Sequence, residues 1–262
     1  MKAVPVLVAV MVALAWASSV LAAPKTGREY DGLVGPVQKV VVSKATLSGE
    51  EGETVEGQPW VTEIRTYNET GDVVEAIEFG RDGDPAERQV LTYDAATYAS
   101  ERMVFWPDGT VKGKFIFAYD DVRKLYAVQD YDADGTLRGK GTIILDHNGN
   151  VLESIDLDPD GRVLSNTTLT YNSVQQVESI TFQIGISAPQ LEVYSYDSKG
   201  NVQHRRDHNT DGSVRFEQHY EGYKLDARGN WIKRKIITKW YDSDELGSEK
   251  SYLIYRKITY YK

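Results

Sequence analysis

A repeat of 26 residues constrains the fold of this chain more than any other feature. Glycines at the predicted turns recur at this interval, at Gly83, Gly109, Gly135 and Gly161, and Gly212 falls one residue short of two further periods. The residues that close the units keep the interval; they are Tyr67, Tyr93, Tyr119, Leu145 and Tyr171, with Tyr196 following after 25 residues. A fixed period of this length is typical of repeat architectures. Because 26 is an even number, equivalent positions in successive units lie on the same face of a strand.

Each unit predicts two β-strands joined by tight turns. Residues 145–172 show the pattern most completely, with an Asn-Gly turn at 148–149 and an Asp-Gly turn at 160–161, each followed by an alternating segment. These dipeptides tolerate positive φ and mark hairpins. No segment after residue 22 keeps helical periodicity over three turns. The sequence therefore predicts an all-β fold of tandem antiparallel hairpins with about 14 to 16 strands, forming a long curled or wrapped sheet, since sheets of that size rarely stay flat.

The apolar residues of the repeats fall mostly on odd numbers. They include Ile77, Phe79, Met103, Phe105, Phe117, Leu125, Tyr131, Ile143, Ile155 and Leu157. If the strands are joined in even register, the odd side is the buried face. The even side mixes charged residues such as Lys112 and Lys140 with apolar ones such as Ile116. We therefore predict that the even side is solvated, with apolar islands.

Three segments are expected along the chain. Residues 1–22 combine a single lysine, a long apolar run and a small-residue ending, which is typical of a secretory signal peptide; a retained membrane anchor is the alternative. Residues 23–66 form an N-terminal leader with the first strands, and residues 67–262 form the repeat domain. The chain has no cysteine, which excludes disulfides and cysteine zinc sites. These features predict a periplasmic or secreted protein.

The closing segment resembles a known repeat family. The run Asp226-Ala227-Arg228-Gly229-Asn230 and the internal segments 67–72, 145–150 and 196–201 are similar to the Tyr-Asp-x-x-Gly-Asn core of the YD, or Rhs-type, repeats of exported bacterial proteins. The resemblance covers residues 67–261. It implies hairpins stacked into a long curling sheet, and a binding, encapsulating or surface role without catalysis. Two units depart from the pattern, with Thr97 and Arg123 in place of glycine, and no toxin domain follows, so encapsulation of a toxin is not carried over.

Three aspartate-rich turns match the opening of calcium-binding loops, D-x-[DN]-x-[DN]-G. Their oxygen ligands would be Asp130, Asp132, Asp134, Asp156, Asp158, Asp160, Asp207, Asn209 and Asp211. The acidic residue that completes such loops is missing, because Gly141, Thr167 and Gln218 occupy the twelfth position. Aspartate before a glycine turn is also what an ordinary hairpin selects. Calcium is thus a possible cofactor, and plain turns are the simpler interpretation.

Candidate binding residues are few. Seventeen tyrosines suit carbohydrate or protein partners, but most repeat tyrosines fall on the predicted core side, where they would pack between hairpins. Trp106, on the even face, is the exposed candidate for ligand binding. The final hairpin carries the basic residues Lys233, Arg234, Lys235 and Lys239, which could contact an anionic envelope polymer or protect a sheet edge from association.

Several classes of function are disfavoured. No Gly-x-Ser-x-Gly, phosphate-loop or His-Glu-x-x-His motif occurs, so we predict that the protein is not an enzyme. A formal net charge of −9 argues against a nucleic-acid partner. An outer-membrane barrel would need one face apolar along its length, whereas Glu75, Gln129 and Glu153 fall on the apolar side, so no integral membrane association is expected.

The sequence therefore predicts an exported, non-catalytic β-repeat scaffold or binding protein of the periplasm or cell surface. Its partner would be another protein or an envelope polysaccharide. The alternative is a calcium-stabilised carbohydrate-binding module, for which the aspartate-rich turns and the aromatic residues are the evidence.

Overall fold

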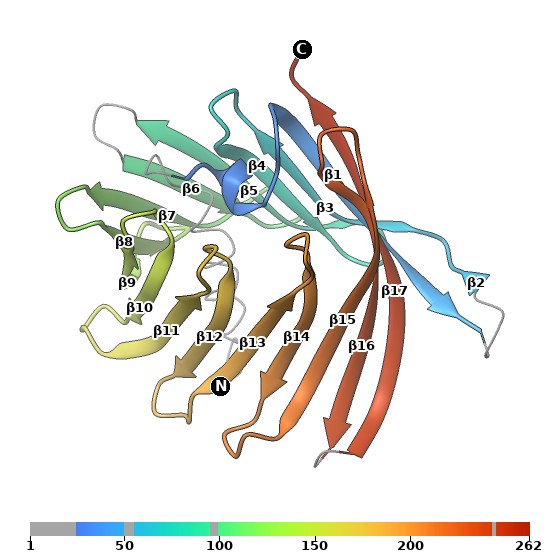
Figure 1. Ribbon diagram of the computed structural model, residues 1–262. Helices are drawn as coiled ribbons and strands as arrows, with labels where there is room; N and C mark the ends of the chain where they lie inside the picture. Colours follow the sequence, from blue (N-terminus) through green and yellow to red (C-terminus); the bar gives the residue numbers. More distant parts are fainter. Residues whose placement is uncertain (1–24, 50–54, 95–98, 243–244) are drawn as a thin grey trace.

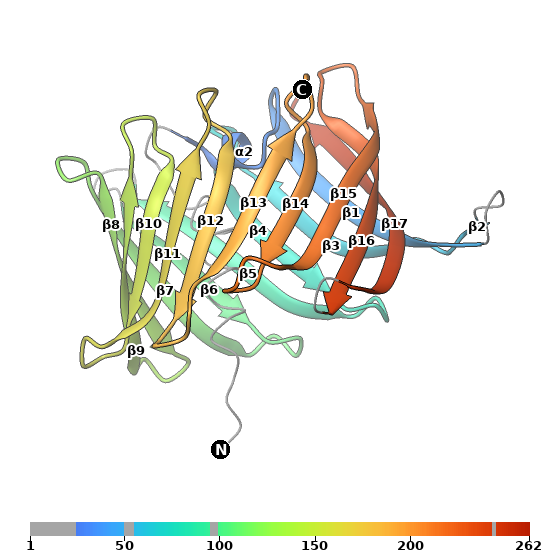
Figure 2. The same ribbon diagram turned by 60° about the horizontal axis from the view of Figure 1, so that its bottom comes forward.

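The computed structural model shows a closed antiparallel β-barrel (Figures 1 and 2). It describes residues 25–49, 55–94, 99–242 and 245–262. Among these residues, 16 strands form the ring: β1 pairs with β3, each strand from β3 onward pairs with the next, and β17 pairs with β1. All-β architecture is confirmed, and the sheet closes on itself rather than remaining an open curl. The signal peptide predicted at residues 1–22 lies outside the described residues.

The strands follow one another around the ring in chain order. They are β1 (Val37–Ser48), β3 (Trp60–Tyr67), β4 (Val73–Phe79), β5 (Pro85–Asp94), β6 (Ala99–Phe105), β7 (Val111–Asp120), β8 (Leu125–Asp132), β9 (Leu137–Leu145), β10 (Val151–Leu157), β11 (Val163–Tyr171), β12 (Val177–Ile184), β13 (Gln190–Tyr196), β14 (Val202–His208), β15 (Val214–Leu225), β16 (Trp231–Asp242) and β17 (Glu245–Tyr260). A short strand, β2 (Val55–Glu56), pairs with the end of β1 outside the ring. One helical turn, α2 (Gly27–Tyr30), precedes the barrel. Within the described residues, no helix is long and apolar enough to cross a bilayer.

Most hairpins share one five-residue turn. In residues 106–110 the Trp106 N–H donates to the Thr110 carbonyl at 2.9 Å, and the Gly109 N–H donates back to the Trp106 carbonyl at 2.9 Å. Gly109 has a φ of 82°, a conformation that costs glycine almost nothing. The end of the barrel that carries this turn is called the far rim, and it also carries the equivalent turns at residues 80–84, 132–136, 158–162 and 209–213. The opposite end is called the plugged rim, and it carries the equivalent turns at residues 68–72, 146–150, 172–176, 197–201 and 226–230. The predicted hairpin turns are thus confirmed, with one at each rim in every complete unit.

The register of these turns corrects the predicted burial pattern. Each turn of this type joins an odd-numbered inward position to an even-numbered one, as where Arg65 pairs with Ala76 and Gly113 pairs with Val104. The inward side therefore falls on odd numbers in β3, β5, β7 and β9 but on even numbers in β4, β6, β8 and β10. The odd residues of these alternate strands face outward, contrary to the prediction; they are Ile77, Phe79, Met103, Phe105, Leu125, Tyr131, Ile155 and Leu157. The 26-residue step itself preserves the face, since Leu91, Phe117 and Ile143 are all buried.

A short segment covers part of one mouth of the barrel. Residues 25–36, which we call the plug, include α2, which lies at the plugged rim (Figure 2). The Arg28 N–H donates to the Gly71 carbonyl at 2.9 Å, the Tyr30 hydroxyl donates to the Gly149 carbonyl, and the Val34 N–H donates to Asn230 Oδ1 at 2.7 Å. Because these three turns follow β3, β9 and β15, the plug is tied to three separate sectors of the ring.

The hydrophobic core lies beneath this plug, against one side of the ring. It combines Leu33 of the plug with buried residues of β1, β3–β5 and β7–β10; these include Val40, Tyr67, Val73, Leu91, Phe117, Tyr126, Ile143, Leu145 and Val151. Burial of such side chains is the main favourable contribution to folding. The core therefore holds the plug in place as well as the strands.

A row of tyrosines links neighbouring strands at the plugged rim. In each case the hydroxyl of a tyrosine near the end of one strand donates to the carbonyl of a residue at the start of the strand before it. The bonds are Tyr93 to Val73 (2.6 Å), Tyr171 to Val151 (2.8 Å), Tyr196 to Val177 (2.7 Å) and Tyr223 to Val202 (2.8 Å). Across the seam, the Tyr261 hydroxyl donates to the Tyr67 carbonyl at 2.6 Å. This tyrosine ladder gives a structural reason for the recurrence of tyrosine at the 26-residue interval.

The outer surface of the barrel carries cross-strand ion pairs. Arg88 pairs with Glu75 at 2.8 Å and Lys235 pairs with Glu221 at 2.9 Å. Glu153 also faces outward, because it pairs with the outward Ile144 and Thr168. A lysine or arginine that faces lipid at the midplane of a bilayer costs about 2 to 4 kcal/mol. The outer surface thus combines ion pairs with the outward apolar residues named above, and the absence of integral membrane association stays a prediction.

Candidate functional site

A cavity of about 410 Å³ lies between the plug and the wall formed by β11–β16. We call it the mouth cavity. Its lining includes Tyr171, Tyr196, Tyr223, Trp231 and Arg234 from the wall, with Tyr30 from the plug. Its volume is within the range of about 300–1,000 Å³ that is usual for ligand sites.

Three members of the tyrosine ladder line this cavity. The hydroxyl hydrogens of Tyr171, Tyr196 and Tyr223 are all donated to backbone carbonyls, so the rings are fixed. The Tyr223 hydroxyl also interacts with Arg234, whereas the hydroxyl oxygens of Tyr171 and Tyr196 can still accept a hydrogen bond. Burial raises the pKa of Tyr196 to about 12, and burial likewise raises the pKa of Tyr171. The hydroxyls therefore stay neutral at physiological pH, and the wall presents rigid aromatic rings to the cavity.

Two arginines lie over Trp231 beside the cavity. The guanidinium carbon of Arg234 is 4.2 Å from the centroid of the Trp231 ring, and that of Arg256 is 3.7 Å from it. Within the part of the chain that the structure describes, neither arginine forms an ion pair, and the Nε of each is buried without an acceptor. Burial lowers the pKa of Arg256 to about 10, with Asp31 opposing and Arg234 adding to this effect. At neutral pH, two positive charges thus lie side by side without a paired carboxylate.

The carboxylates of the plug do not supply that pairing. Glu29 Oε2 accepts the Thr26 N–H at 2.6 Å as part of the cap of α2. Asp31 binds Arg65 and the Tyr67 hydroxyl. Although both residues line the mouth cavity, their charges are directed to partners other than Arg234.

Amide side chains complete the lining at the rim. Gln175 Oε1 accepts hydrogen bonds from Asn148 at 3.0 Å and from Asn150 at 2.7 Å, and Asn201 Nδ2 donates to Asp197 at 2.9 Å. These contacts leave Gln175 Nε2 and Asn201 Oδ1 without a partner among the described residues. The cavity therefore offers one amide donor and one amide acceptor in addition to its rings and its cation.

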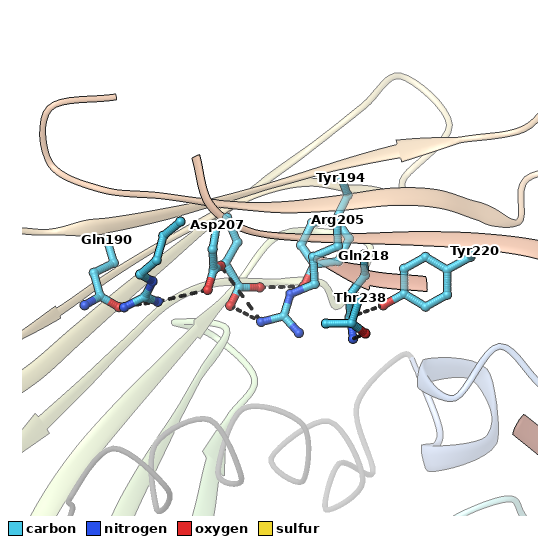
Figure 3. A network of polar contacts seen from close by, with 9 residues as sticks. Gln190, Tyr194, Arg205, Asp207, Gln218, Tyr220 and Thr238 are labelled. Atoms are coloured by element: carbon cyan, nitrogen blue, oxygen red, sulfur yellow. Dashed lines mark hydrogen bonds and ion pairs between the residues drawn. The ribbon is translucent and has the colours of Figure 1, made fainter. Parts of the chain in front are cut away.

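A second polar cluster lies deeper inside the same wall (Figure 3). Arg205 binds Glu192 at 2.6 Å, Arg215 binds Asp207 at 3.0 Å, and the Tyr194 hydroxyl donates to Glu192 at 2.7 Å. Figure 3 shows the side chains of Gln190, Asp207, Arg205, Gln218 and Tyr220 on one side of their strands. We call this cluster the luminal network. Its two arginines and two carboxylates balance, unlike the arginines at Trp231.

The three aspartates of the first predicted calcium loop contact different partners. Asp130 accepts two hydrogen bonds from Arg138 Nη2, at 2.8 and 2.9 Å, and Asp132 lies 3.3 Å from Arg138 Nε. Asp134 instead accepts the Thr136 N–H at 2.9 Å within the far-rim turn. Side chains of this loop thus stabilise a turn and an ion pair.

The other two predicted loops are arranged similarly. Asp156 accepts the Ser165 hydroxyl at 2.7 Å, Asp158 accepts the Arg162 N–H at 2.8 Å, and Asp160 is exposed in the turn. In the third loop, Asp207 belongs to the luminal network, while Asn209 and Asp211 both bind Ser213.

No cluster of three or more histidine, cysteine, aspartate or glutamate side chains suited to a metal ion occurs among the residues that the structure describes. The first ligand position of each loop is an inward strand residue, whereas the fifth lies in the turn. The calcium hypothesis stays a prediction, to be tested by titration.

Trp106 is exposed, as the sequence predicts, with 48% of its surface accessible. It begins a turn of the far rim, and Lys112 Nζ lies 4.6 Å from its ring centroid. Because it is at the rim opposite the plug, it does not contribute to the mouth cavity. Its role in ligand binding stays a prediction.

The fold is similar to that of a porin-like protein of known structure. A porin-like protein from Bacteroides uniformis superposes with a TM-score of 0.58 and 12% sequence identity, over 86% of this chain and 99% of that chain. One from Bacteroides vulgatus has a TM-score of 0.41 and 14% identity, over 86% of this chain and 98% of that chain. At such identities the likeness to the first protein concerns the fold alone. Neither a protein-family model nor a curated protein matches this sequence, so the resemblance to YD repeats stays a prediction.

Proposed function

We propose that the protein is a non-catalytic binding protein of the periplasm or cell surface, and that it holds a small ligand in the mouth cavity. The observation that carries this proposal is the lining of the cavity, where fixed aromatic rings surround a cation without an ion-pair partner and two amide atoms, Gln175 Nε2 and Asn201 Oδ1, without a hydrogen-bond partner among the described residues. Ligand sites commonly combine apolar walls with a few polar groups in this way. A cavity with a purely structural role would be expected to have its buried polar groups paired.

The remaining features support export and binding rather than catalysis. The signal peptide predicted at residues 1–22 and the charged outer surface suit a water-filled compartment of the envelope. In the mouth cavity, Glu29 and Asp31 are engaged by Thr26, Arg65 and Tyr67. Carboxylates held in this way are poorly placed for general acid–base chemistry, which needs reach to a substrate proton.

The test is a thermal-shift screen of the mature chain, residues 23–262, against small sugars, sugar acids, amino acids and short peptides. A ligand at 100 times its dissociation constant stabilises the native state by about 2.7 kcal/mol, which raises the Tm by several degrees. Each ligand found is retested on Tyr196→Ala, which opens the cavity wall, and on Tyr131→Ala, which removes an outward-facing tyrosine. The proposal requires loss of binding in the first variant only; equal binding to both variants would contradict it.

The second candidate is a calcium-stabilised carbohydrate-binding module at the far rim. It is favoured by one observation, namely that exposed Trp106 shares this rim with the turns at 132–136, 158–162 and 209–213, which end the three aspartate-rich motifs. Thermal unfolding of the mature chain with calcium and with chelator tests it. A saturable rise in Tm that disappears when Asp156 and Asp158 are both replaced by asparagine would establish a calcium site. An unchanged Tm would leave these residues as turn and ion-pair acceptors.

A further inference from the structure

Arginines without an ion-pair partner among the described residues mark a place for an anion beside the mouth cavity. Among the described interior arginines, Arg65 pairs with Asp31 and Glu63, and Arg205 pairs with Glu192. Arg102 forms no ion pair with a described residue, but it lies over the rings of Phe115 and Phe117 and does not line the mouth cavity. Beside the mouth cavity, Arg234 and Arg256 share the ring of Trp231, and no described carboxylate forms an ion pair with either. Since a buried charge is costly unless it is paired, a bound anion would stabilise this pair of cations.

We propose that the mouth cavity binds a sugar acid, that is, a hydroxylated ring that carries a carboxylate. This inference rests on the proposed function, because it names the ligand class of the same cavity. The carboxylate binds the guanidinium group of Arg234, which lines the cavity. Arginine matches a carboxylate with two parallel N–H···O hydrogen bonds, a geometry that lysine cannot reproduce.

The aromatic lining fits the ring of such a ligand. Tyr196, Tyr223 and Trp231 all line the cavity, and Tyr223 meets Trp231 edge to face with the ring centroids 6.4 Å apart. Aromatic rings offer flat apolar surface next to polar tips. The C–H face of a saccharide has the same character, because its hydroxyls project from the ring edge. Aromatic surface and cation therefore lie next to each other, as a sugar acid requires.

The hydroxyl groups of the ligand find partners at the rim. Gln175 Nε2 is a free donor and Asn201 Oδ1 is a free acceptor among the described residues. The tyrosine hydroxyl oxygens add further acceptors, because their own hydrogens are committed to the backbone. Gln175 and Gly200 are exposed, so the cavity can be entered from the plugged rim without unfolding of the barrel.

The experiment is isothermal titration of the mature chain with four probes: glucuronate, glucose, benzoate and inorganic phosphate. Saturable binding of glucuronate, with at least about tenfold weaker binding of the other three probes, is expected. Arg234→Gln should weaken glucuronate binding about ten- to hundredfold, because a hydrogen-bonded ion pair is lost. Lys233→Gln removes a neighbouring charge from the outer surface and is the matched control, with unchanged affinity. Arg234→Lys keeps the charge but should still lose affinity, and circular dichroism checks that each variant is folded.

Four outcomes would overturn the inference. If glucose binds as tightly as glucuronate, the carboxylate has no role in recognition. If phosphate or benzoate binds as tightly as glucuronate, the hydroxylated ring has no role. If folded Arg234→Lys and Arg234→Gln bind glucuronate as tightly as the wild-type chain, Arg234 has no role. Absence of glucuronate binding to the wild-type chain is the fourth. None of these decides the proposed function, which fails only if no ligand of the wider screen depends on Tyr196.

Discussion

The two sides of the barrel interior are built from the same repeat but from different chemistry. On β3–β10, the hydrophobic core occupies inward positions such as Phe117, Tyr126 and Ile143, with buried polar residues such as Gln89 and Arg102 among them. On β12–β16, the buried inward positions include Glu192, Asp207 and Thr238. Because the turns, the tyrosine ladder and the backbone pairing are common to both sides, the fold does not depend on which side chains fill the lumen. One side is thus free to hold the plug by packing, while the other keeps a polar wall and a cavity.

The largest expected effect is in the packed side. Phe117→Ala should lower the free energy of unfolding by about 3 to 5 kcal/mol, because it leaves a cavity in the core beneath the plug. Urea denaturation followed by circular dichroism measures this. The matched variant Phe216→Ala lies on the polar side, where Phe216 meets Trp240 edge to face, and it should cost clearly less. Equal losses would show that stability is spread evenly around the ring.

A smaller effect is expected when the luminal network is broken. Glu192→Gln removes the carboxylate that binds Arg205, whose side chain is 25% exposed. Partial exposure weakens the penalty, so we expect a loss of about 1 to 2 kcal/mol in chemical denaturation. Glu221→Gln, which breaks an ion pair on the outer surface, should cost less than about 1 kcal/mol. If Glu192→Gln and Glu221→Gln lower the free energy of unfolding equally, the luminal network contributes no more to stability than an ion pair on the outer surface.

The shared turn should respond equally on both sides. Gly135 and Gly212 have φ values of 85° and 88°, and open space surrounds the position of an added Cβ at each. Alanine there should cost about 1 to 2 kcal/mol through backbone strain alone. Urea denaturation of Gly135→Ala and Gly212→Ala should give the same loss within error. If only one variant lowers the free energy of unfolding, the turns on the two sides do not contribute equally to stability.

The smallest effect concerns pH and contrasts the lumen with the rim. Burial raises the pKa of Asp156, so its charge destabilises the native state at neutral pH, and this cost disappears as pH falls through the raised pKa. At the plugged rim, hydrogen bonds from Tyr260, Arg228 and Asn230 outweigh burial and lower the pKa of Asp226. That carboxylate stabilises the native state above its unfolded pKa, and the contribution is lost as pH falls through the lowered one.

Asp156→Asn should therefore raise the urea midpoint at neutral pH, with a gain that shrinks on acidification. Asp226→Asn should lower the midpoint at neutral pH, and this loss should also shrink as the wild-type carboxylate becomes protonated. Urea titrations at neutral pH and near pH 4 measure both differences. If both variants shift the urea midpoint in the same direction at neutral pH, the electrostatics of the lumen and of the rim do not differ.

Much of the architecture is visible in the sequence because it is local. Turn glycines, closing tyrosines and alternating segments each report on hairpins of adjacent strands, so the all-β repeat and its turns could be predicted. Closure could not, since it depends on pairing between β1 and β17 and on the bond from Tyr261 to Tyr67, which join opposite ends of the chain. The switch of the inward face in alternate strands was missed because the turns were assigned an even register.

The candidate site was missed for a related reason. Arg234 was assigned to a basic run at a sheet edge, together with Lys233, Lys235 and Lys239. Strand register separates them, because Arg234 pairs with the inward Ile254, whereas Lys233 pairs with the outward Tyr255. Only alternation along β16 could have indicated this, by placing Arg234 on the side of Ile236 and Thr238, which are buried. Its lack of a carboxylate partner is a property of the closed ring and is invisible in the sequence.

The tyrosine ladder makes the 26-residue unit the smallest segment by which the ring could be enlarged. Duplication of one unit would add two strands, one turn at each rim and one further tyrosine bond, and it would leave the inward faces of all existing strands unchanged. Copy number could therefore rise in evolution, or be raised by design, without breaking the ring. The plug would then no longer reach its three attachment turns, because the circumference would increase while its length stayed the same. The length of the plug thus limits how many copies of the unit a barrel can contain while it keeps all three attachments.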